Sequence, residues 1–168
     1  LMKYNYRKKW LREGSLVGLP KNLKKLLMYN LSLTKRLEMK NSVTLLSSKM
    51  QLTKQSRYSP KRYSLVRKVQ LHGKLDKPIL ATSYIPANSI RGRLMAIKVL
   101  KDRSLASLLY KNPKFKKKSI DYKILPNHVM RLTCFEKRSL RIKVEELFPK
   151  KNNYPNLRLI ECRRNIVN

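Results

Sequence analysis

The hydrophobic positions of this chain follow a period of two in some stretches and of about 3.6 in others. Apolar and polar residues alternate over 63–73 and again over 77–85, with a basic turn between the two stretches. Such alternation places one set of side chains on each face of a strand, so these stretches predict a β-hairpin. The same rhythm returns in "HVMRLTCF" and "SLRIKVEEL", which predict a second hairpin, and in "NLRLIEC" (156–162), which predicts one more strand.

Two other segments follow the helical period. Pro20 is favoured as the first residue of a helix, and leucines recur three and four positions apart from Leu23 onward. We therefore expect one long or two short amphipathic helices within 20–54. Residues 89–111 show the cleanest helical pattern, and Pro113 ends it. The predicted fold class is α+β, a small mixed core of amphipathic helices and an antiparallel hairpin or meander with long basic extensions.

The charge of the chain changes this picture more than any motif does. The chain has 41 Lys and Arg residues against 9 Asp and Glu residues, a formal net charge of +32, and both halves are basic. A free protein with this charge would repel itself in the compact state and would bind polyanions, among which nucleic acid is the first candidate. The hydrophobic content of 42% excludes a wholly disordered polycation.

Breaks in the hydrophobic pattern divide the chain into three parts. Residues 1–19 are predicted to form a basic N-terminal arm, and residues 20–54 the helical segment. Residues 55–168 are predicted to fold as one α+β RNA-binding domain that carries a basic loop over 111–123. No apolar stretch is long enough to span a membrane, because Lys or Arg interrupts each of them.

In the predicted basic loop, lysines are expected to face phosphate, while Ile120 and Tyr122 turn back to the core. Aromatic residues elsewhere among the basic ones either stack on unpaired bases or anchor their loops. The first turn of the helix predicted over 89–111 is basic, and free N–H groups at such a position bind phosphate. The residues expected to bind RNA are Arg7, Lys8, Lys9, Trp10, Arg57, Lys61, Arg62, Arg91, Arg93, Lys114, Phe115, Lys116, Lys117, Lys118, Lys150, Lys151, Arg163 and Arg164.

The sequence shows no motif for catalysis, for a cofactor or for a metal. Its 4 glycines are too few for a glycine-rich phosphate loop, and GxSxG and HExxH are missing. His72, His128, Cys134 and Cys162 lack the spacing of a zinc site. We therefore predict no enzyme activity, no cofactor, no metal and no small-molecule substrate. The two cysteines are expected to be reduced thiols, with a disulfide between neighbouring strands as the alternative.

The lysine clusters "KFKKK" and "PKKNNYP", the small core and the scarcity of residues with GC-rich codons together resemble a ribosomal protein of a mitochondrial ribosome. The resemblance is to this class over the whole chain and not to one family. It implies a structural role in the mitochondrial matrix, in which the chain binds rRNA phosphates and neighbouring ribosomal proteins, and it is compatible with a gene in the organelle. The alternatives are another organellar nucleic-acid-binding factor, for nucleoids or RNA processing, and a basic accessory subunit of a membrane complex.

Overall fold

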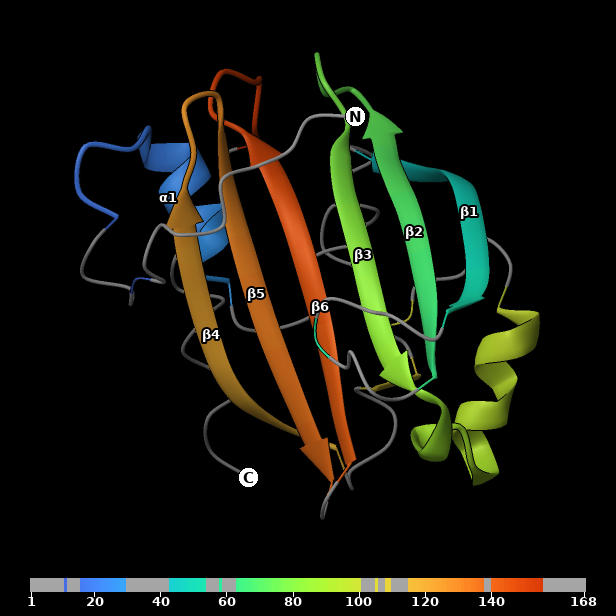
Figure 1. Ribbon diagram of the computed structural model, residues 1–168. Coiled ribbons are helices and arrows are strands. Elements are labelled where there is room, and N and C mark those ends of the chain that lie inside the picture. Colours follow the sequence, from blue (N-terminus) through green and yellow to red (C-terminus); the bar gives the residue numbers. More distant parts are fainter. Residues whose placement is uncertain are drawn as a thin grey trace, which may run out of the picture.

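An antiparallel sheet with short helices on one face dominates the computed structural model (Figure 1). The structure describes residues 11, 16–29, 43–53, 58, 63–100, 105, 108, 109, 115–137 and 140–155. The strands in this part of the chain are β1 (Val43–Thr53), β2 (Ser64–Gly73), β3 (Ile79–Pro86), β4 (Lys116–Ile124), β5 (His128–Lys137) and β6 (Leu140–Pro149). The helical elements of several consecutive described residues are α1 (Lys21–Leu27) and the 3-10 helices η2 (Ala87–Ser89) and η3 (Gly92–Val99).

The strands lie in the order β1-β2-β3-β6-β5-β4, so two three-stranded meanders meet where β3 pairs with β6. Each neighbouring pair is antiparallel. At the outer edge of β4, Leu11 pairs with Tyr122 through two backbone N–H···O bonds of 2.8 Å. This pairing covers part of an edge that would otherwise expose its hydrogen-bonding groups. Each described helix is too short or too polar to cross a membrane.

Both hairpins predicted from alternation are confirmed. The stretches 63–73 and 77–85 are β2 and β3, and they pair directly along their length. "HVMRLTCF" and "SLRIKVEEL" lie in β5 and β6, which also pair as a hairpin. The strand predicted over 156–162 lies outside the described residues.

The predicted α+β class is wrong, because the described residues are predominantly β with one short α-helix. Within the segment 20–54, only Lys21–Leu27 is α-helix among the described residues, whereas Val43–Thr53 is a strand. A register shift between Leu45 and Ser47 explains the misreading. The extra residue of a bulge changes the phase of the alternation, so that apolar positions come to stand three or four apart.

Two further element predictions also need correction. The long helix expected over 89–111 is replaced over Gly92–Val99 by a 3-10 helix, and residues 105, 108 and 109 are helical. The basic loop expected over 111–123 is strand from Lys116 onward. Tyr122 is buried and Ile120 packs against the core, as expected of them.

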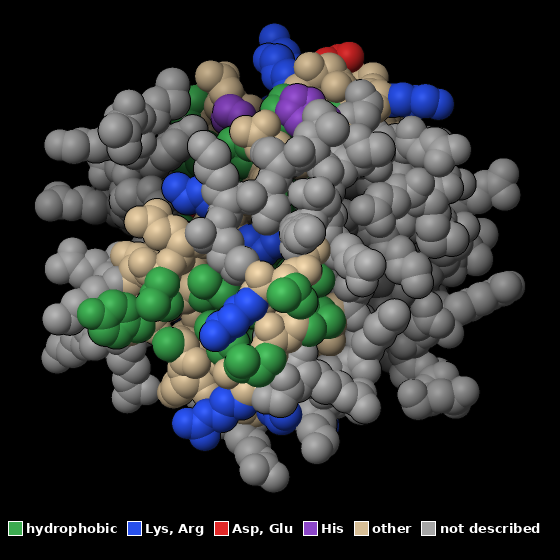
Figure 2. All heavy atoms as spheres, turned by 90° about the vertical axis from the view of Figure 1, so that its right-hand side faces the viewer, with side chains coloured by type: hydrophobic (Ala, Val, Ile, Leu, Met, Phe, Trp, Pro, Cys, Tyr) green, Lys and Arg blue, Asp and Glu red, His purple; other side chains and the backbone are tan. Residues whose placement is uncertain are grey.

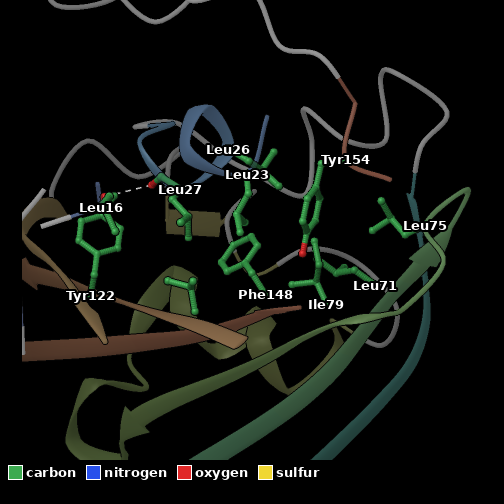
Figure 3. Close-up of a cluster of buried hydrophobic side chains, with 11 residues drawn as sticks. Leu16, Leu23, Leu26, Leu27, Leu71, Leu75, Ile79, Tyr122, Phe148 and Tyr154 are labelled. Atoms are coloured by element: carbon green, nitrogen blue, oxygen red, sulfur yellow. Dashed lines mark hydrogen bonds between the residues drawn. The ribbon is translucent and has the colours of Figure 1, made fainter. Parts of the chain in front are cut away.

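The register of the strands assigns the side chains to two faces, because residues paired across strands point to the same side. One face, called here the covered face, packs two clusters of hydrophobic side chains at opposite ends of the sheet. The α1 cluster consists of Leu16, Leu23, Leu26, Leu27, Leu71, Leu75, Ile79, Tyr122, Val129, Phe148 and Tyr154 (Figure 3). The η3 cluster consists of Leu65, Ile85, Ile97, Leu100, Leu105, Leu109, Phe115, Phe135 and Ile142.

Helix α1 has only seven residues, too few for a stable helix by itself. Its buried leucines Leu23, Leu26 and Leu27 pack on the sheet, and its first turn follows Pro20 without a side-chain cap. At the other end, the Tyr122 hydroxyl donates to the Leu27 carbonyl at 3.1 Å (Figure 3). The helix is therefore held by contacts with the strands beneath it.

We expect Tyr122→Phe to lower the free energy of unfolding by about 1 kcal/mol, the usual net contribution of one buried hydrogen bond. Urea denaturation at neutral pH measures the change. Tyr63→Phe, at a side chain that is 51% exposed, is the matched control and should change stability by less than about 0.5 kcal/mol. Equal stabilities for the two variants would show that the bond to Leu27 contributes nothing net.

Candidate functional site

Between the two hydrophobic clusters, the covered face is polar. The register aligns Arg67 of β2 with Ser83 of β3, and Ser83 with Val144 of β6, which in turn pairs with Thr133 of β5. In the adjacent row Glu146 of β6 pairs with Arg131 of β5. We call the polar members of these rows, together with Lys117 of β4, the polar belt: Arg67, Ser83, Lys117, Arg131, Thr133 and Glu146.

Three charged members of the polar belt are almost inaccessible to solvent, and Lys117 is partly buried. Arg67 is 2% exposed, Arg131 4% and Glu146 7%. Removing a charge from water is costly unless it is paired or used, so buried ionic groups commonly belong to a site. The belt therefore requires a stabilising partner for each of its charges.

Arg131 has its partners within the protein. Its Nε donates to Oε2 of Glu146 at 2.6 Å, and a second guanidinium nitrogen lies 2.6 Å from the same oxygen. The remaining nitrogen donates to the carbonyls of Leu26, Leu27 and Tyr29 at 3.4, 3.0 and 3.2 Å, at the end of α1. Arg131 thus donates to carbonyls at the end of the helix, where no further turn supplies N–H donors. It joins α1 to Glu146.

Glu146 keeps one oxygen outside this network. Both contacts with Arg131 go to Oε2, and the part of the chain that the structure describes gives Oε1 no hydrogen bond. The guanidinium thereby fixes the orientation of the carboxylate and stabilises its charge. Oε1 is the carboxylate oxygen of the belt available to a ligand.

Lys117 approaches the same group from β4. The pKa of its ammonium is lowered to about 8, mainly by burial and then by the positive charge of Arg131, while the negative charge of Glu146 partly opposes the shift. Near neutral pH, most of the lysine is therefore still charged. The belt then holds three cations against one carboxylate, a net charge of +2.

The other acidic residues of the strands do not balance this charge. By their register, Asp121, Glu136 and Glu145 point to the face opposite the covered one. Glu136 instead pairs with exposed Arg141 at 3.1 Å and with Lys118 at 3.6 Å. An anion of charge −2 would neutralise the belt.

Among the residues predicted to bind RNA, those whose side chains the structure describes differ in burial. Arg91, Lys116, Lys118 and Lys151 are exposed, and Lys150 is partly buried. Phe115 is buried in the η3 cluster, with the Lys137 ammonium 5.6 Å from its ring centre. Lys117 alone among the described members of that set belongs to the polar belt. The side chains of Arg7, Lys8, Lys9, Trp10, Arg57, Lys61, Arg62, Arg93, Lys114, Arg163 and Arg164 lie outside the described residues.

Sequence reasoning missed Arg67, Arg131 and Glu146 as site residues. A signal for Arg67 exists, since it stands in phase with Leu65, Val69 and Leu71 in an alternating strand. A charged residue at a position that alternation assigns to the core is a candidate site residue. Arg131 likewise stands in a mainly apolar stretch, and register then shows that it faces Glu146.

The described residues contain no cluster of His, Cys, Asp and Glu that could hold a metal ion. Cys134 is a free, partly buried thiol, and burial raises its pKa. The other cysteine, Cys162, lies outside the described residues.

Comparison with known proteins identifies a family for the chain. The family model described as chorismate lyase matches residues 5–150. No curated protein matches the chain significantly. Among solved structures, the chain is similar to the ligand-binding domain of a protein described as a GntR-family transcriptional regulator from Bordetella bronchiseptica. That likeness has 10% sequence identity and a TM-score of 0.45, and it covers 69% of this chain and 96% of that one.

The family match contradicts the resemblance to mitochondrial ribosomal proteins. The structural role, the rRNA and ribosomal-protein partners and the mitochondrial location implied by that resemblance are corrected with it, as are the two alternatives. The predictions of no enzyme activity and no small-molecule substrate are not supported either, because the matched family is named for an enzyme and its substrate. The net charge predicted the wrong kind of partner because it is a property of composition. The polar belt depends instead on which few charged side chains the strand register places on the covered face.

Proposed function

Because the chain belongs to the chorismate lyase family, we propose that it binds chorismate at the polar belt and cleaves it. The single observation that carries the proposal is the set of three cations and one carboxylate on the covered face, of which Arg67, Arg131 and Glu146 are buried and Lys117 is partly buried. Chorismate carries two carboxylates and is a dianion at neutral pH, so its charge matches the net +2 of the belt. Apolar clusters on both sides of the belt suit its carbon ring.

The residues of the belt suggest distinct roles in this reaction. Arg67 is a bidentate donor suited to hold one carboxylate. Glu146, oriented by Arg131, is placed to accept a proton through Oε1. Ala81 and Ser83 are the small side chains of β3 beside these groups, and they suit a ligand lying across the middle of the sheet.

The proposed reaction is an elimination that makes the ring aromatic. Glu146 takes the hydrogen from the ring carbon that bears the hydroxyl, and the electron pair of that C–H bond enters the ring. The bond between the adjacent ring carbon and the ether oxygen of the three-carbon side chain then breaks. Its electron pair leaves on that oxygen with the three-carbon enol. Glu146 returns the proton to the methylene carbon of the enol. The products are 4-hydroxybenzoate and pyruvate, and all atoms of chorismate are accounted for.

The exterior of the protein favours the encounter with such a substrate. Figure 2 shows Lys and Arg side chains distributed over the coloured part of one face, with little acidic surface among them. A strongly positive exterior raises the local concentration of anions and accelerates their association. The charge of +32 fits this role without a polyanionic partner.

Incubation of the purified protein with chorismate tests the proposal. We expect 4-hydroxybenzoate, measured by its ultraviolet absorbance, and pyruvate, measured with NADH and lactate dehydrogenase, to form in equal amounts. Heat-denatured protein and bovine serum albumin are the controls for spontaneous decay. If chorismate binds but is recovered intact, the protein is a ligand-binding protein and the proposed lyase reaction is wrong.

A further inference from the structure

We propose that the hydroxyl of Ser83 binds the ring hydroxyl of the substrate and so turns the carbon that bears this hydroxyl toward Glu146. Ser83 lies in β3, the strand beside β6, which carries Glu146. The inference rests on the function proposed above and deepens it, because it names a specificity-determining residue of the same site.

A polar side chain at position 83 departs from the pattern of its strand. Buried and more accessible residues alternate along β3, and the buried ones are Ile79, Ala81, Ser83 and Ile85. Ser83 is 5% exposed and is the polar member of this series. Burying a hydroxyl stabilises a fold less than burying an apolar side chain of similar size. Binding of a ligand is a use of the hydroxyl that accounts for its place among apolar residues.

The ion pair of Glu146 indicates on which side of the carboxylate the substrate lies. Arg131 reaches Glu146 from β5, and both of its contacts go to Oε2. Oε2 is therefore turned toward β5, and Oε1 lies on the side of β3, the other neighbour of β6. The ring carbon that loses its hydrogen to Oε1 lies on this side of Glu146.

On the β3 side, Ser83 is the side chain suited to bind the ring hydroxyl. Ala81 pairs directly with Glu146 but has no polar group, whereas Ser83 pairs with Val144, two residues before Glu146 on β6. Ser83 and Glu146 are therefore diagonal neighbours on the covered face, about 7–8 Å apart at the backbone. A hydroxyl has one donor and two acceptor positions and can rotate, so that of Ser83 can donate to a ligand hydroxyl or accept from it.

This contact connects recognition of the substrate with the reaction. The ring hydroxyl and the hydrogen that Glu146 removes are bonded to one and the same carbon. When Ser83 holds the hydroxyl, it also fixes the direction of the C–H bond at that carbon, and such orientation of reacting groups contributes strongly to rate. A ligand that lacks the hydroxyl loses this contact and keeps its other contacts with the site.

Thr133 provides a matched comparison on the other side of Glu146. Like Ser83, it is 5% exposed, carries a hydroxyl and pairs with Val144, but it does so from β5. It therefore flanks Glu146 on the side of Oε2, where Arg131 binds. Replacing Thr133 by valine removes a buried hydroxyl from the same row of the sheet without changing the side of Oε1.

Calorimetric titration with 4-hydroxybenzoate and with benzoate tests the role of Ser83, because the two ligands differ by one hydroxyl. We expect Ser83→Ala to raise the Kd of 4-hydroxybenzoate by about 3- to 10-fold, the effect of losing one hydrogen bond. The Kd of benzoate should change by less than about twofold, since benzoate has no hydroxyl for Ser83 to bind. Thr133→Val should change neither Kd by more than about twofold.

Turnover gives a second readout of the same contact. In Ser83→Ala, kcat/KM for chorismate should fall by at least about threefold, because the C–H bond is no longer oriented. In Thr133→Val it should stay within about twofold of wild type. Circular dichroism and urea denaturation show that both variants are folded before the constants are compared.

Three results would overturn the inference. If Ser83→Ala weakens both ligands equally, its effect on the site is general. If it weakens neither, Ser83 does not contact the ring hydroxyl, and if Thr133→Val alone weakens 4-hydroxybenzoate selectively, the hydroxyl is bound on the β5 side. In each of these cases wild-type turnover still supports the proposed function. A wild-type protein that neither converts chorismate nor binds 4-hydroxybenzoate would refute the proposed function, and the inference with it.

Discussion

Arg131→Met is expected to lower the free energy of unfolding by about 3–5 kcal/mol, the cost of breaking a buried ion pair by removing one partner. The variant leaves the Glu146 carboxylate buried at 7% exposure without its guanidinium. It also removes the donors to the carbonyls of Leu26, Leu27 and Tyr29. Urea denaturation followed by circular dichroism measures the loss.

A second ion pair of the same residue types provides the control. Arg141 donates to Glu136 at 3.1 Å, but its side chain is 67% exposed, and exposed ion pairs contribute little to stability. Arg141→Met should therefore leave stability nearly unchanged. Both variants remove one positive charge. The difference between their free energies of unfolding therefore reflects the burial of the ion pair and not the net charge.

The double variant R131M/E146M separates the ion pair from the helix contacts. Replacing both charges by apolar side chains of similar size is often neutral, so most of the loss should be recovered. Recovery should stop about 1–2 kcal/mol short of wild type, because the carbonyls of Leu27 and Tyr29 still lack the guanidinium donor. A double variant no more stable than Arg131→Met would show that helix capping, and not the pair with Glu146, dominates.

The coupling of α1 to Glu146 explains why a seven-residue helix is part of the site. The guanidinium of Arg131 bonds to both, so the position of the helix end and the orientation of the carboxylate depend on one side chain. Tyr122 adds a second bond to Leu27. The α1 cluster thus contributes to the hydrophobic core and also holds α1 beside the polar belt.

Sequence periodicity predicted the paired strands because their alternation is uninterrupted. The stretch from Leu65 to Leu71 keeps one phase throughout, and so β2 and its hairpin with β3 could be predicted. The two register shifts fall where prediction failed: in β1, which looked helical, and in β4, which looked like a basic loop. A bulge depends on the partner strand, which no local pattern contains.

The same limit applies to the site. Arg67 could be suspected because its strand assigns it inward, but the pairing of Arg131 with Glu146 requires the register of β5 and β6. The sequence marks Lys117 only by its charge, which predicted RNA as the ligand. The bulge in β4 is what distinguishes Lys117 from Lys116 and Lys118. In a chain with 41 cations, composition cannot show which of them are buried.

Arg67→Gln is expected to lower kcat/KM for chorismate by about 30-fold or more, which corresponds to about 2 kcal/mol for removing one partner of a buried charged contact. Arg67 is 2% exposed and points to the covered face, where it pairs in register with Ser83. Glutamine keeps a donor and much of the volume but loses the charge and the bidentate geometry. Initial rates at low chorismate concentration give kcat/KM directly.

Lys68→Gln is the control for this variant. Lys68 is the next residue of β2, exposed and on the opposite face, so its replacement removes the same charge without touching the belt. We expect its kcat/KM to stay within about twofold of wild type. If both variants lowered kcat/KM equally, the overall positive field and not Arg67 would govern the reaction with the dianion. A loss of kcat/KM in Arg67→Gln alone, in folded protein, would place the substrate at the covered face of β2. Burying a charge there costs free energy, so a buried arginine favours a ligand of matching charge.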